Sequence, residues 1–236
     1  MLQRYFFILL SVACTSLYGC SESERSVALD TDKDTDSTTQ TDTVKSEKVK
    51  TIVFFGNSLT AGYGLEPDQA FPALIQQRID SLNLPYKVVN AGVSGETSAG
   101  GNSRINWLLK QPIDVFVLEL GANDGLRGIR TDETYKNLQS IIRKVREKNP
   151  DAKIILAGMQ MPPSMGQRYT KDFEKVYADL AKEENVALIP FLLDGVAGES
   201  KLNQADGIHP TEEGQKILAN NVWAVLESIL NEPSTN

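Results

Sequence analysis

Five short apolar runs recur along the chain, and amphipathic helical patterns separate them. The runs occupy residues 51–55, 86–89, 113–120, 153–156 and 187–189. Continuous apolar runs of this length are typical of strands that are buried on both faces of a parallel sheet. Helical spacing of apolar residues falls in residues 68–82, 98–110, 131–145, 170–180 and 211–229. This alternation predicts an α/β fold, a three-layer α/β/α sandwich around a central, mostly parallel sheet of about five strands.

Helix starts are predicted from side chains that can accept a hydrogen bond from the first turn. Asp68, Thr131, Thr170 and Thr211 each precede an apolar helical pattern. Short polar side chains of this kind satisfy backbone N–H groups that have no partner inside the helix. We therefore expect these four residues to cap the corresponding helices.

Glycine-containing segments follow the first three predicted strands directly. They are residues 56–64, 92–95 and 121–124. In a parallel sheet the carboxyl ends of the strands lie at one edge, and ligands bind there. The three segments are therefore expected to converge on one site.

The chain contains a single histidine, His209, within the sequence Asp-Gly-Ile-His-Pro of residues 206–210. Imidazole is the usual proton carrier of hydrolytic chemistry near neutral pH. Asp206 lies three residues upstream, and Ser58 lies far away in a glycine-flanked segment. The order Ser…Asp…His is that of a nucleophile–acid–base triad. The alternative is a histidine that only packs against or caps the last helix.

Composition excludes several other classes of function. The net charge of −7 argues against nucleic-acid binding, which needs a basic surface. Both cysteines, Cys14 and Cys20, lie within the first twenty residues, so the folded part has no thiol ligand. With one histidine as well, the sequence disfavours a zinc or transition-metal centre, and we expect no cofactor. An all-carboxylate calcium or magnesium site stays open.

The N-terminal residues have the pattern of an export signal followed by a tether. Arg4 precedes an apolar core at residues 5–12, and residues 17–20 read Leu-Tyr-Gly-Cys. This ending resembles the bacterial lipobox, in which the cysteine is lipidated and becomes the mature N-terminus. Tyr18 is larger than the usual residue, so ordinary secretion remains an alternative. Residues 1–20 are thus predicted to be a lipoprotein signal peptide.

Residues 21–50 are rich in Ser, Thr, Asp, Glu and Lys and almost lack large apolar side chains. Such a segment buries too little apolar surface to offset the entropy cost of ordering, so we expect a disordered polar tether. The catalytic candidate residues then belong to a domain at residues 51–232. The predicted product is an exported bacterial lipoprotein, anchored to a membrane and facing the periplasm or the cell surface.

Four blocks together resemble the GDSL, or SGNH, hydrolase superfamily. They are residues 56–62 (Gly-Asn-Ser-Leu-Thr-Ala-Gly), 90–97 (Asn-Ala-Gly-Val-Ser-Gly-Glu-Thr), 120–124 (Leu-Gly-Ala-Asn-Asp) and 206–210. All four occur in order at predicted strand ends or before the last helix. Residues 121–128 and 159–163 look like the bacterial acyl-thioesterase/lysophospholipase and arylesterase branch. The resemblance implies a flavodoxin-like SGNH hydrolase fold.

The resemblance also implies roles for individual residues. Ser58 would be the nucleophile, His209 the general base and Asp206 the residue that orients the imidazole. The oxyanion hole would consist of the backbone N–H groups of Ser58 and Gly95 and the side-chain amide of Asn123. An esterase acting on lysophospholipids, aryl or alkyl esters, or acyl thioesters would follow.

Two features qualify this resemblance. The family usually has Asp where this chain has Asn57, so a negative charge beside the nucleophile is missing. In the related branch, the loop after the fourth strand lines an acyl channel. Here that loop supplies an adaptable apolar set that could bind substrate or could simply pack the loop: Met159, Met161, Pro162, Pro163 and Met165.

Two other functions remain open from the sequence. The same superfamily supports carbohydrate acetylesterases, which act on acetylated polysaccharide. A catalytically silent surface lipoprotein that binds an acyl or glycan ligand would also fit the fold, because fold alone does not imply activity.

The lipobox predicts that Cys20→Ser releases the protein from the membrane. Stable anchoring requires two or more acyl chains, and this variant cannot receive the modification. We expect a soluble protein in the extract without detergent, and mass spectrometry of the wild type should find Cys20 acylated at the mature N-terminus. Continued membrane retention of the variant would contradict the prediction.

Overall fold

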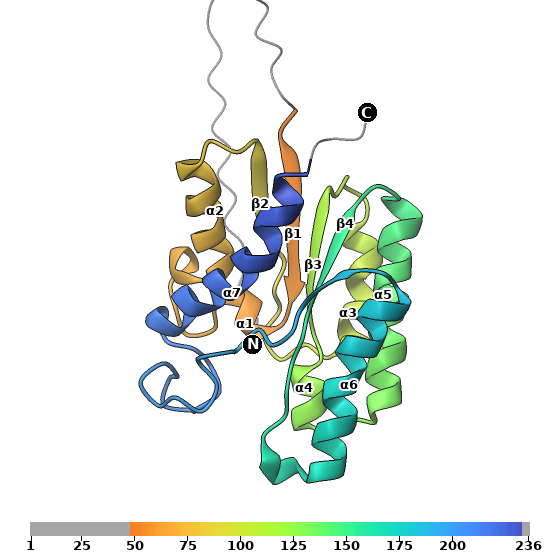
Figure 1. Ribbon diagram of the computed structural model, residues 1–236, viewed down its shortest axis with the longest axis vertical. Helices are drawn as coiled ribbons and strands as arrows, with labels where there is room; N and C mark the ends of the chain where they lie inside the picture. Colours follow the sequence, from red (N-terminus) through yellow and green to blue (C-terminus); the bar gives the residue numbers. More distant parts are fainter. Residues whose placement is uncertain (1–47, 233–236) are drawn as a thin grey trace, which may run out of the picture. The chain divides into compact units, whose positions relative to one another are not determined.

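A sheet of five parallel strands forms the centre of the domain in the computed structural model, which describes residues 48–232 (Figure 1). The strands are β1 (Lys50–Gly56), β2 (Tyr86–Asn90), β3 (Val115–Glu119), β4 (Lys153–Ala157) and β5 (Ala187–Ile189). Their order is β2-β1-β3-β4-β5, and each neighbouring pair is parallel. The predicted strand number and direction are confirmed.

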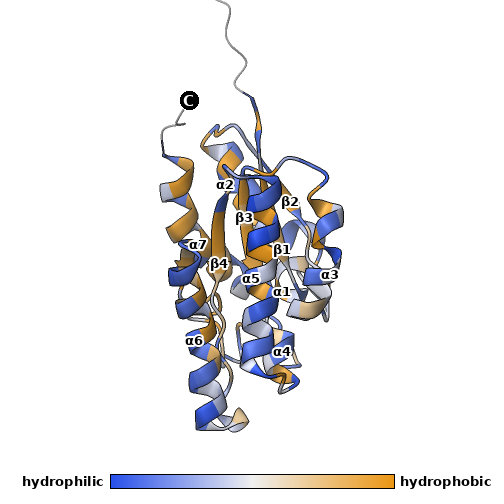
Figure 2. Cartoon of the chain, turned by 90° about the vertical axis from the view of Figure 1, so that its right-hand side faces the viewer, coloured by the Kyte–Doolittle hydropathy of each residue, from blue (hydrophilic) through white to orange (hydrophobic). Residues whose placement is uncertain are grey.

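Helices cover both faces of this sheet. On one face lie α2 (Phe71–Ser81) and α7 (Glu212–Leu230), and on the other lie α3 (Ser98–Leu108), α5 (Thr131–Lys148) and α6 (Gln167–Glu183) (Figure 1). The strands are apolar along most of their length, whereas the helices are mixed and turn polar residues outward (Figure 2). This is the predicted three-layer α/β/α sandwich.

Aromatic side chains of the central strands fill the core between the layers. Phe54 points to the α2 side, where its ring meets Phe71 edge-on at 5.4 Å between centroids. Its neighbour Phe55 contacts Phe116 of β3, with ring centroids 5.6 Å apart. All four side chains are fully buried. Successive strand residues thus anchor the two opposite helix layers, as the alternation of side chains along a strand requires.

Two predicted helix caps have different outcomes. The hydroxyl of Thr211 accepts a hydrogen bond from Gly214 N at 3.3 Å and caps α7, as predicted. Asp68 does not cap α2, because it lies inside the short 3-10 turn η1 (Pro67–Gln69). The helix begins later, at Phe71, and Pro72 occupies its first turn. Proline is favoured there because its missing N–H would have no partner within the helix.

The other two caps were also placed incorrectly. Thr131 is the first residue of α5, and Arg130 occupies the cap position. Helix α6 begins at Gln167, three residues before the predicted cap Thr170. Gly166 precedes it with φ of 91°, a backbone conformation that glycine adopts readily. The hydrophobic periodicity located both helices but not their first residues.

The predicted signal peptide, Cys20 and nearly all of the tether lie outside the described residues. Strand β1 begins at Lys50, one residue before the predicted start of the domain. Of the helices in residues 48–232, none combines the length and apolar character needed to cross a membrane.

Three segments meet at the carboxyl edge of the sheet, at the lower end of β1 in Figure 1. Two of them form short helices that the sequence did not predict, α1 (Ser58–Ala61) after β1 and α4 (Ala122–Leu126) after β3. The third is the loop of residues 91–97 between β2 and α3. The predicted convergence of the three glycine-containing segments is confirmed.

Two adjacent glycines of α3 provide a test of the packing. A methyl group on Gly101 would lie 2.3 Å from Leu120 Cδ1 and 3.1 Å from the Phe55 ring. On the exposed neighbour Gly100 it would meet the flexible Glu96 side chain, at 3.2 Å or more, and Thr97 Oγ1 at 3.7 Å. We expect Gly101→Ala to lower the free energy of unfolding by about 1–3 kcal/mol, because the core cannot expand. Gly100→Ala should leave it unchanged or raise it, because alanine favours helix. Urea unfolding of both variants checks this, and equal stabilities would contradict it.

Candidate active site

The turn after β1 presents Ser58 at the edge of the sheet. Asn57 caps α1, because its Oδ1 accepts a hydrogen bond from Leu59 N at 2.9 Å. Gly62, with φ of 73°, ends the helix after a single turn. Ser58 is the first helical residue, and within residues 48–232 its backbone N–H has no hydrogen-bond partner. The hydroxyl and this N–H are both available at the head of the turn.

A tight turn before α7 holds Asp206 and His209 together. Asp206 Oδ1 accepts hydrogen bonds from the backbone N–H groups of Ile208 and His209, each at 3.0 Å. Its Oδ2 lies 2.7 Å from His209 Nδ1. The hydrogen bond from the His209 ring, together with the two backbone donors, lowers the pKa of Asp206 to about 2. The carboxylate is therefore ionised throughout the range in which ester hydrolysis is measured.

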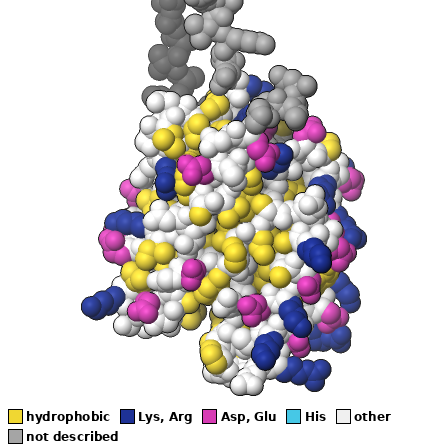
Figure 3. Space-filling view, in the orientation of Figure 1, with side chains coloured by type: hydrophobic (Ala, Val, Ile, Leu, Met, Phe, Trp, Pro, Cys, Tyr) yellow, Lys and Arg dark blue, Asp and Glu magenta, His cyan; other side chains and the backbone are white. Residues whose placement is uncertain are grey.

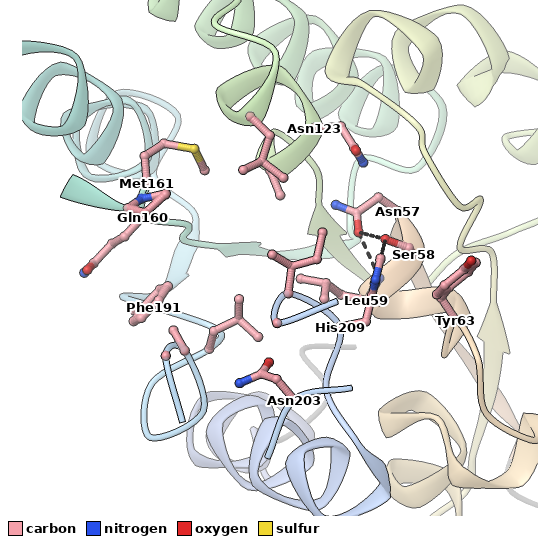
Figure 4. Close-up of a pocket in the computed structure, with 18 of the residues that line it drawn as sticks. Asn57, Ser58, Leu59, Tyr63, Asn123, Gln160, Met161, Phe191, Asn203 and His209 are labelled. Atoms are coloured by element: carbon pink, nitrogen blue, oxygen red, sulfur yellow. Dashed lines mark hydrogen bonds between the residues drawn. The ribbon is translucent and has the colours of Figure 1, made fainter. Parts of the chain in front are cut away.

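The structure brings Ser58, His209 and Asp206 into one hydrogen-bonded row. Ser58 Oγ lies 2.9 Å from His209 Nε2, although the residues are 151 positions apart (Figure 4). Because Nδ1 faces the carboxylate, it carries the ring proton and leaves Nε2 to accept the serine proton. The Tyr63 ring packs against the imidazole at 4.5 Å between centroids. The arrangement can deprotonate a hydroxyl nucleophile.

Asn123 and Gly95 supply further hydrogen-bond donors beside this row. Asn123 Nδ2 donates to Glu96 O at 3.0 Å, and an amide nitrogen has a second hydrogen for another acceptor. Figure 4 places the Asn123 side chain next to Asn57 and Ser58. Gly95 has φ of 79°, and among the described residues its N–H has no hydrogen-bond partner. These donors can stabilise a negatively charged oxygen on an atom bound to Ser58.

An ion pair that the sequence analysis missed fixes the loop carrying Gly95. Arg104 of α3 pairs with Glu96, with Nε and Oε1 2.6 Å apart. Its Nη2 also donates to Ala91 O at 2.8 Å, and its guanidinium lies 3.9 Å from the centre of the Phe55 ring. One side chain thereby joins both ends of the loop to the sheet. The only sequence signal is the spacing of eight residues between Glu96 and Arg104.

A buried acid, Asp124, connects the loop of Gly95 to α4. Asp124 is fully buried and accepts hydrogen bonds from Ser98 N at 2.8 Å and from Ser98 Oγ at 2.5 Å. Arg127, at the end of α4, donates to Gly95 O at 3.0 Å. These contacts tie the segment of Gly95 to the helix of Asn123. The side-chain amide of Asn123 and the backbone N–H of Gly95 are thus held in a fixed relative position.

A cavity of about 610 Å³ extends from this row of residues. Ser58 and His209 lie at one end, and Gln160, Met161 and Phe191 lie at the other (Figure 4). The space-filling view shows a hollow at this edge of the molecule with apolar side chains beside it (Figure 3). The apolar lining residues include Leu126, Met161, Pro162, Pro163, Phe191, Leu193 and Ala197.

The predicted substrate-binding residues separate into two groups. Met161 and Pro162 line the cavity, together with Pro163. Met159 does not line it, because its side chain is 2% exposed and packs in the core below. The opposite wall, which includes Phe191, Leu193, Ala197 and Gly198, was not predicted. Its apolar side chains follow β5 without helical or strand periodicity, so the pattern alone gave them no role.

Titratable side chains elsewhere in the described part of the chain form no metal centre. Within residues 48–232 no group of three or more His, Cys, Asp or Glu side chains could hold a metal ion.

Comparison with known proteins identifies a family and several similar proteins. Residues 54–217 match the GDSL-like lipase/acylhydrolase family. The chain is 43% identical over 182 residues to esterase TesA of Pseudomonas aeruginosa, covering 77% of this chain and 90% of that protein. It is 37% identical over 193 residues to thioesterase 1/protease 1/lysophospholipase L1 of Escherichia coli, covering 81% and 90%. The crystal structure of a psychrotrophic esterase, EstA from Pseudoalteromonas sp., inhibited by monoethylphosphonate, superposes with a TM-score of 0.73 at 32% identity, covering 78% and 100%.

The geometry predicts that Asn123→Ala reduces kcat for ester hydrolysis by roughly 10²–10³, with a much smaller change in KM. The reason is that the amide would stabilise charge that is present mainly in the transition state. Steady-state kinetics on a chromogenic ester measures both constants. Asn149→Ala is the control and should keep kcat, because it removes a part-buried amide that accepts from Ile113 N at 2.9 Å before the start of β3, at the opposite edge of the sheet. A rise in KM alone would assign Asn123 to substrate binding.

Proposed function

Because this chain belongs to the GDSL-like lipase/acylhydrolase family and is a carboxylic ester hydrolase, we propose that Ser58, His209 and Asp206 carry out the reaction. The substrates would be acyl esters with an apolar acyl chain, such as lysophospholipids and aryl or alkyl esters, and acyl thioesters. The observation that carries the proposal is the row Ser58–His209–Asp206 at the end of an apolar cavity.

The first half of the reaction forms an acyl-enzyme. His209 Nε2 takes the proton of Ser58 Oγ, and the oxygen attacks the carbonyl carbon of the ester. Asp206 remains ionised and stabilises the imidazolium that results. The tetrahedral intermediate collapses when the carbon–oxygen bond to the alcohol, or the carbon–sulfur bond of a thioester, breaks. His209 gives its proton to this leaving group.

The second half hydrolyses the acyl-enzyme with water. His209 accepts a proton from water, the hydroxide attacks the acyl carbon, and Ser58 leaves with the proton returned by His209. In both halves the carbonyl oxygen becomes negatively charged. The N–H groups of Ser58 and Gly95 and the amide of Asn123 would receive it, and each such donor lowers the barrier by about 3 kcal/mol.

The cavity lining supports an acyl chain as the group that enters the pocket. Leu126, Met161, Phe191 and Leu193 offer apolar surface, and each buried methylene of a substrate contributes about 0.8 kcal/mol. A carbohydrate acetylesterase would need polar groups to bind sugar hydroxyls and has only an acetyl group to bury. A silent binding protein has no need for a serine within 2.9 Å of an imidazole nitrogen.

We further propose that the enzyme acts as a membrane-anchored lipoprotein through Cys20. The sequence pattern of residues 17–20 supports this location. Acyl-ester substrates in a lipid surface would then be within reach of the catalytic domain, because the tether predicted for residues 21–50 would span about 30 Å as a flexible chain.

A series of p-nitrophenyl esters from acetyl to palmitoyl tests the substrate class on the full-length chain. We expect kcat/KM to rise with chain length until the cavity is filled, because each added methylene is removed from water. Phe191→Trp enlarges the side chain at the far end of the cavity and should lower kcat/KM for long esters while leaving the acetyl ester unchanged.

The controls separate this proposal from the other functions. Ser58→Ala should abolish hydrolysis and keep the fold, since the hydroxyl adds little to packing. Residual turnover above a few per cent would refute the assignment of Ser58. Preference for acetylated xylan over all acyl-chain esters would indicate a carbohydrate acetylesterase. Ligand binding with no turnover by the wild type would indicate a silent binding protein.

A further inference from the structure

A buried carboxylate lies directly behind the turn that carries Ser58. Glu119 is the last residue of β3 and is 1% exposed. Its Oε1 accepts a hydrogen bond from Asn57 Nδ2 at 2.7 Å. Its Oε2 accepts from Asn57 N at 3.1 Å and from Thr60 Oγ1 at 2.8 Å. Within the described part of the chain, the hydrogen bonds to this side chain therefore come from Asn57 and Thr60, on either side of Ser58.

The position is costly for a carboxylate. None of the ion pairs within residues 48–232 includes Glu119. Burial raises the pKa of Glu119 to about 7, although the hydrogen bonds from Thr60 and Asn57 act in the opposite direction. Removing a charge from water in this way is unfavourable unless donors replace the water. The fold retains an acid here at a cost in stability, which points to a role other than packing.

The surrounding chain leaves no space for a residue larger than glycine at position 56. A methyl group on Gly56 would lie 2.1 Å from Thr60 Oγ1 and 2.5 Å from Glu119 Oε2. Gly56 is paired with Glu119 across the two strands. The backbone can therefore approach the carboxylate closely only because residue 56 has no side chain.

The carboxylate determines which way the Asn57 amide faces. Because Glu119 accepts from Nδ2, the amide oxygen Oδ1 points the other way, toward the serine turn. There it accepts from Leu59 N at 2.9 Å and lies 3.5 Å from Ser58 Oγ. If the amide were flipped, Nδ2 would face the Leu59 N–H, and two donors would oppose each other.

We propose that Glu119 is a positioning residue for the nucleophile, which acts through the Asn57 amide to hold Ser58 Oγ in reach of His209 Nε2. The proposal rests on the proposed role of Ser58. In this chain a neutral amide, that of Asn57, lies next to the serine. The negative charge belongs to Glu119, which contacts the amide from behind. Displacement of the serine oxygen by a fraction of an ångström would weaken its 2.9 Å contact with the imidazole.

Glu119→Gln tests this proposal with almost no change in shape. The new amide group must place N–H donors against either Asn57 Nδ2 or Asn57 N. We expect kcat, and the rate at which a phosphonate ester modifies Ser58, to fall roughly 10- to 100-fold while KM stays within about twofold. Assays at about pH 8.5 keep the wild-type carboxylate ionised.

The double variant Asn57→Asp with Glu119→Gln provides the rescue. It exchanges the amide and the carboxylate, so the amide at position 119 donates to the carboxylate at position 57. The amide oxygen at position 119 accepts from the backbone N–H of residue 57 and from Thr60. The second oxygen of the carboxylate at position 57 again accepts from Leu59 N. We expect kcat and the modification rate to return to within about threefold of wild type.

A matched control distinguishes positioning from stability. Glu184 is also a buried carboxylate, 6% exposed, but it pairs with Arg143 and Arg146 away from the site. Glu184→Gln should lower Tm and keep kcat. The proposal is overturned if folded Glu119→Gln keeps wild-type kcat, or if the double variant regains Tm but not kcat. Activity in Ser58→Ala would instead refute the proposed function itself.

Discussion

Parallel pairing of β1 with both β2 and β3 is the constraint on which the site depends. Because all three strands end at the same edge, the segments that follow them begin at nearly the same level. Ser58, Gly95 and Asn123 each lie within a few residues of one of these strand ends. The register also pairs Gly56 of β1 with Glu119 of β3, so the turn that carries Ser58 lies next to the buried carboxylate.

The histidine reaches this edge from the opposite end of the sequence. Its loop is held by Asn203, whose Nδ2 donates to Val196 O at 2.7 Å and to Glu199 O at 2.9 Å. Gln204 then joins the loop to the serine side, since its Nε2 donates to Tyr63 O at 2.7 Å. Gln215 of α7 adds a second link, because its Nε2 donates to Leu59 O at 3.4 Å.

Two buried acids stiffen the site, and neither has a basic partner among residues 48–232. Glu119 fixes the turn of Ser58, and Asp124 joins the loop of Gly95 to α4. Each carboxylate is satisfied by backbone and side-chain donors from a neighbouring segment. Such a network costs stability if any donor is removed, and when complete it fixes relative positions closely. Catalysis by charge stabilisation benefits from this, because donors that are already oriented need no rearrangement in the transition state.

The order of strands and helices, the glycine-containing turns and the candidate residues Ser58, Asp206 and His209 could all be predicted from the sequence. Hydrophobic periodicity and the positions of glycines are local features, so they can be recognised in one sequence without the tertiary structure. Helix starts were less accessible, as Asp68 and Thr170 illustrate, because a proline or a glycine nearby decided where the first turn began.

The amino-acid sequence by itself determined the α/β architecture and the edge of the sheet at which the chemistry lies. Only the tertiary structure decided that Glu119 faces Asn57, that Met159 packs in the core and that Phe191 completes the cavity wall. Glu119 is an acid within the apolar run of residues 113–120, and nothing in that run specifies its partner. The physical reason is that such roles arise from contacts between segments distant in sequence, and these contacts exist only once the strands have paired.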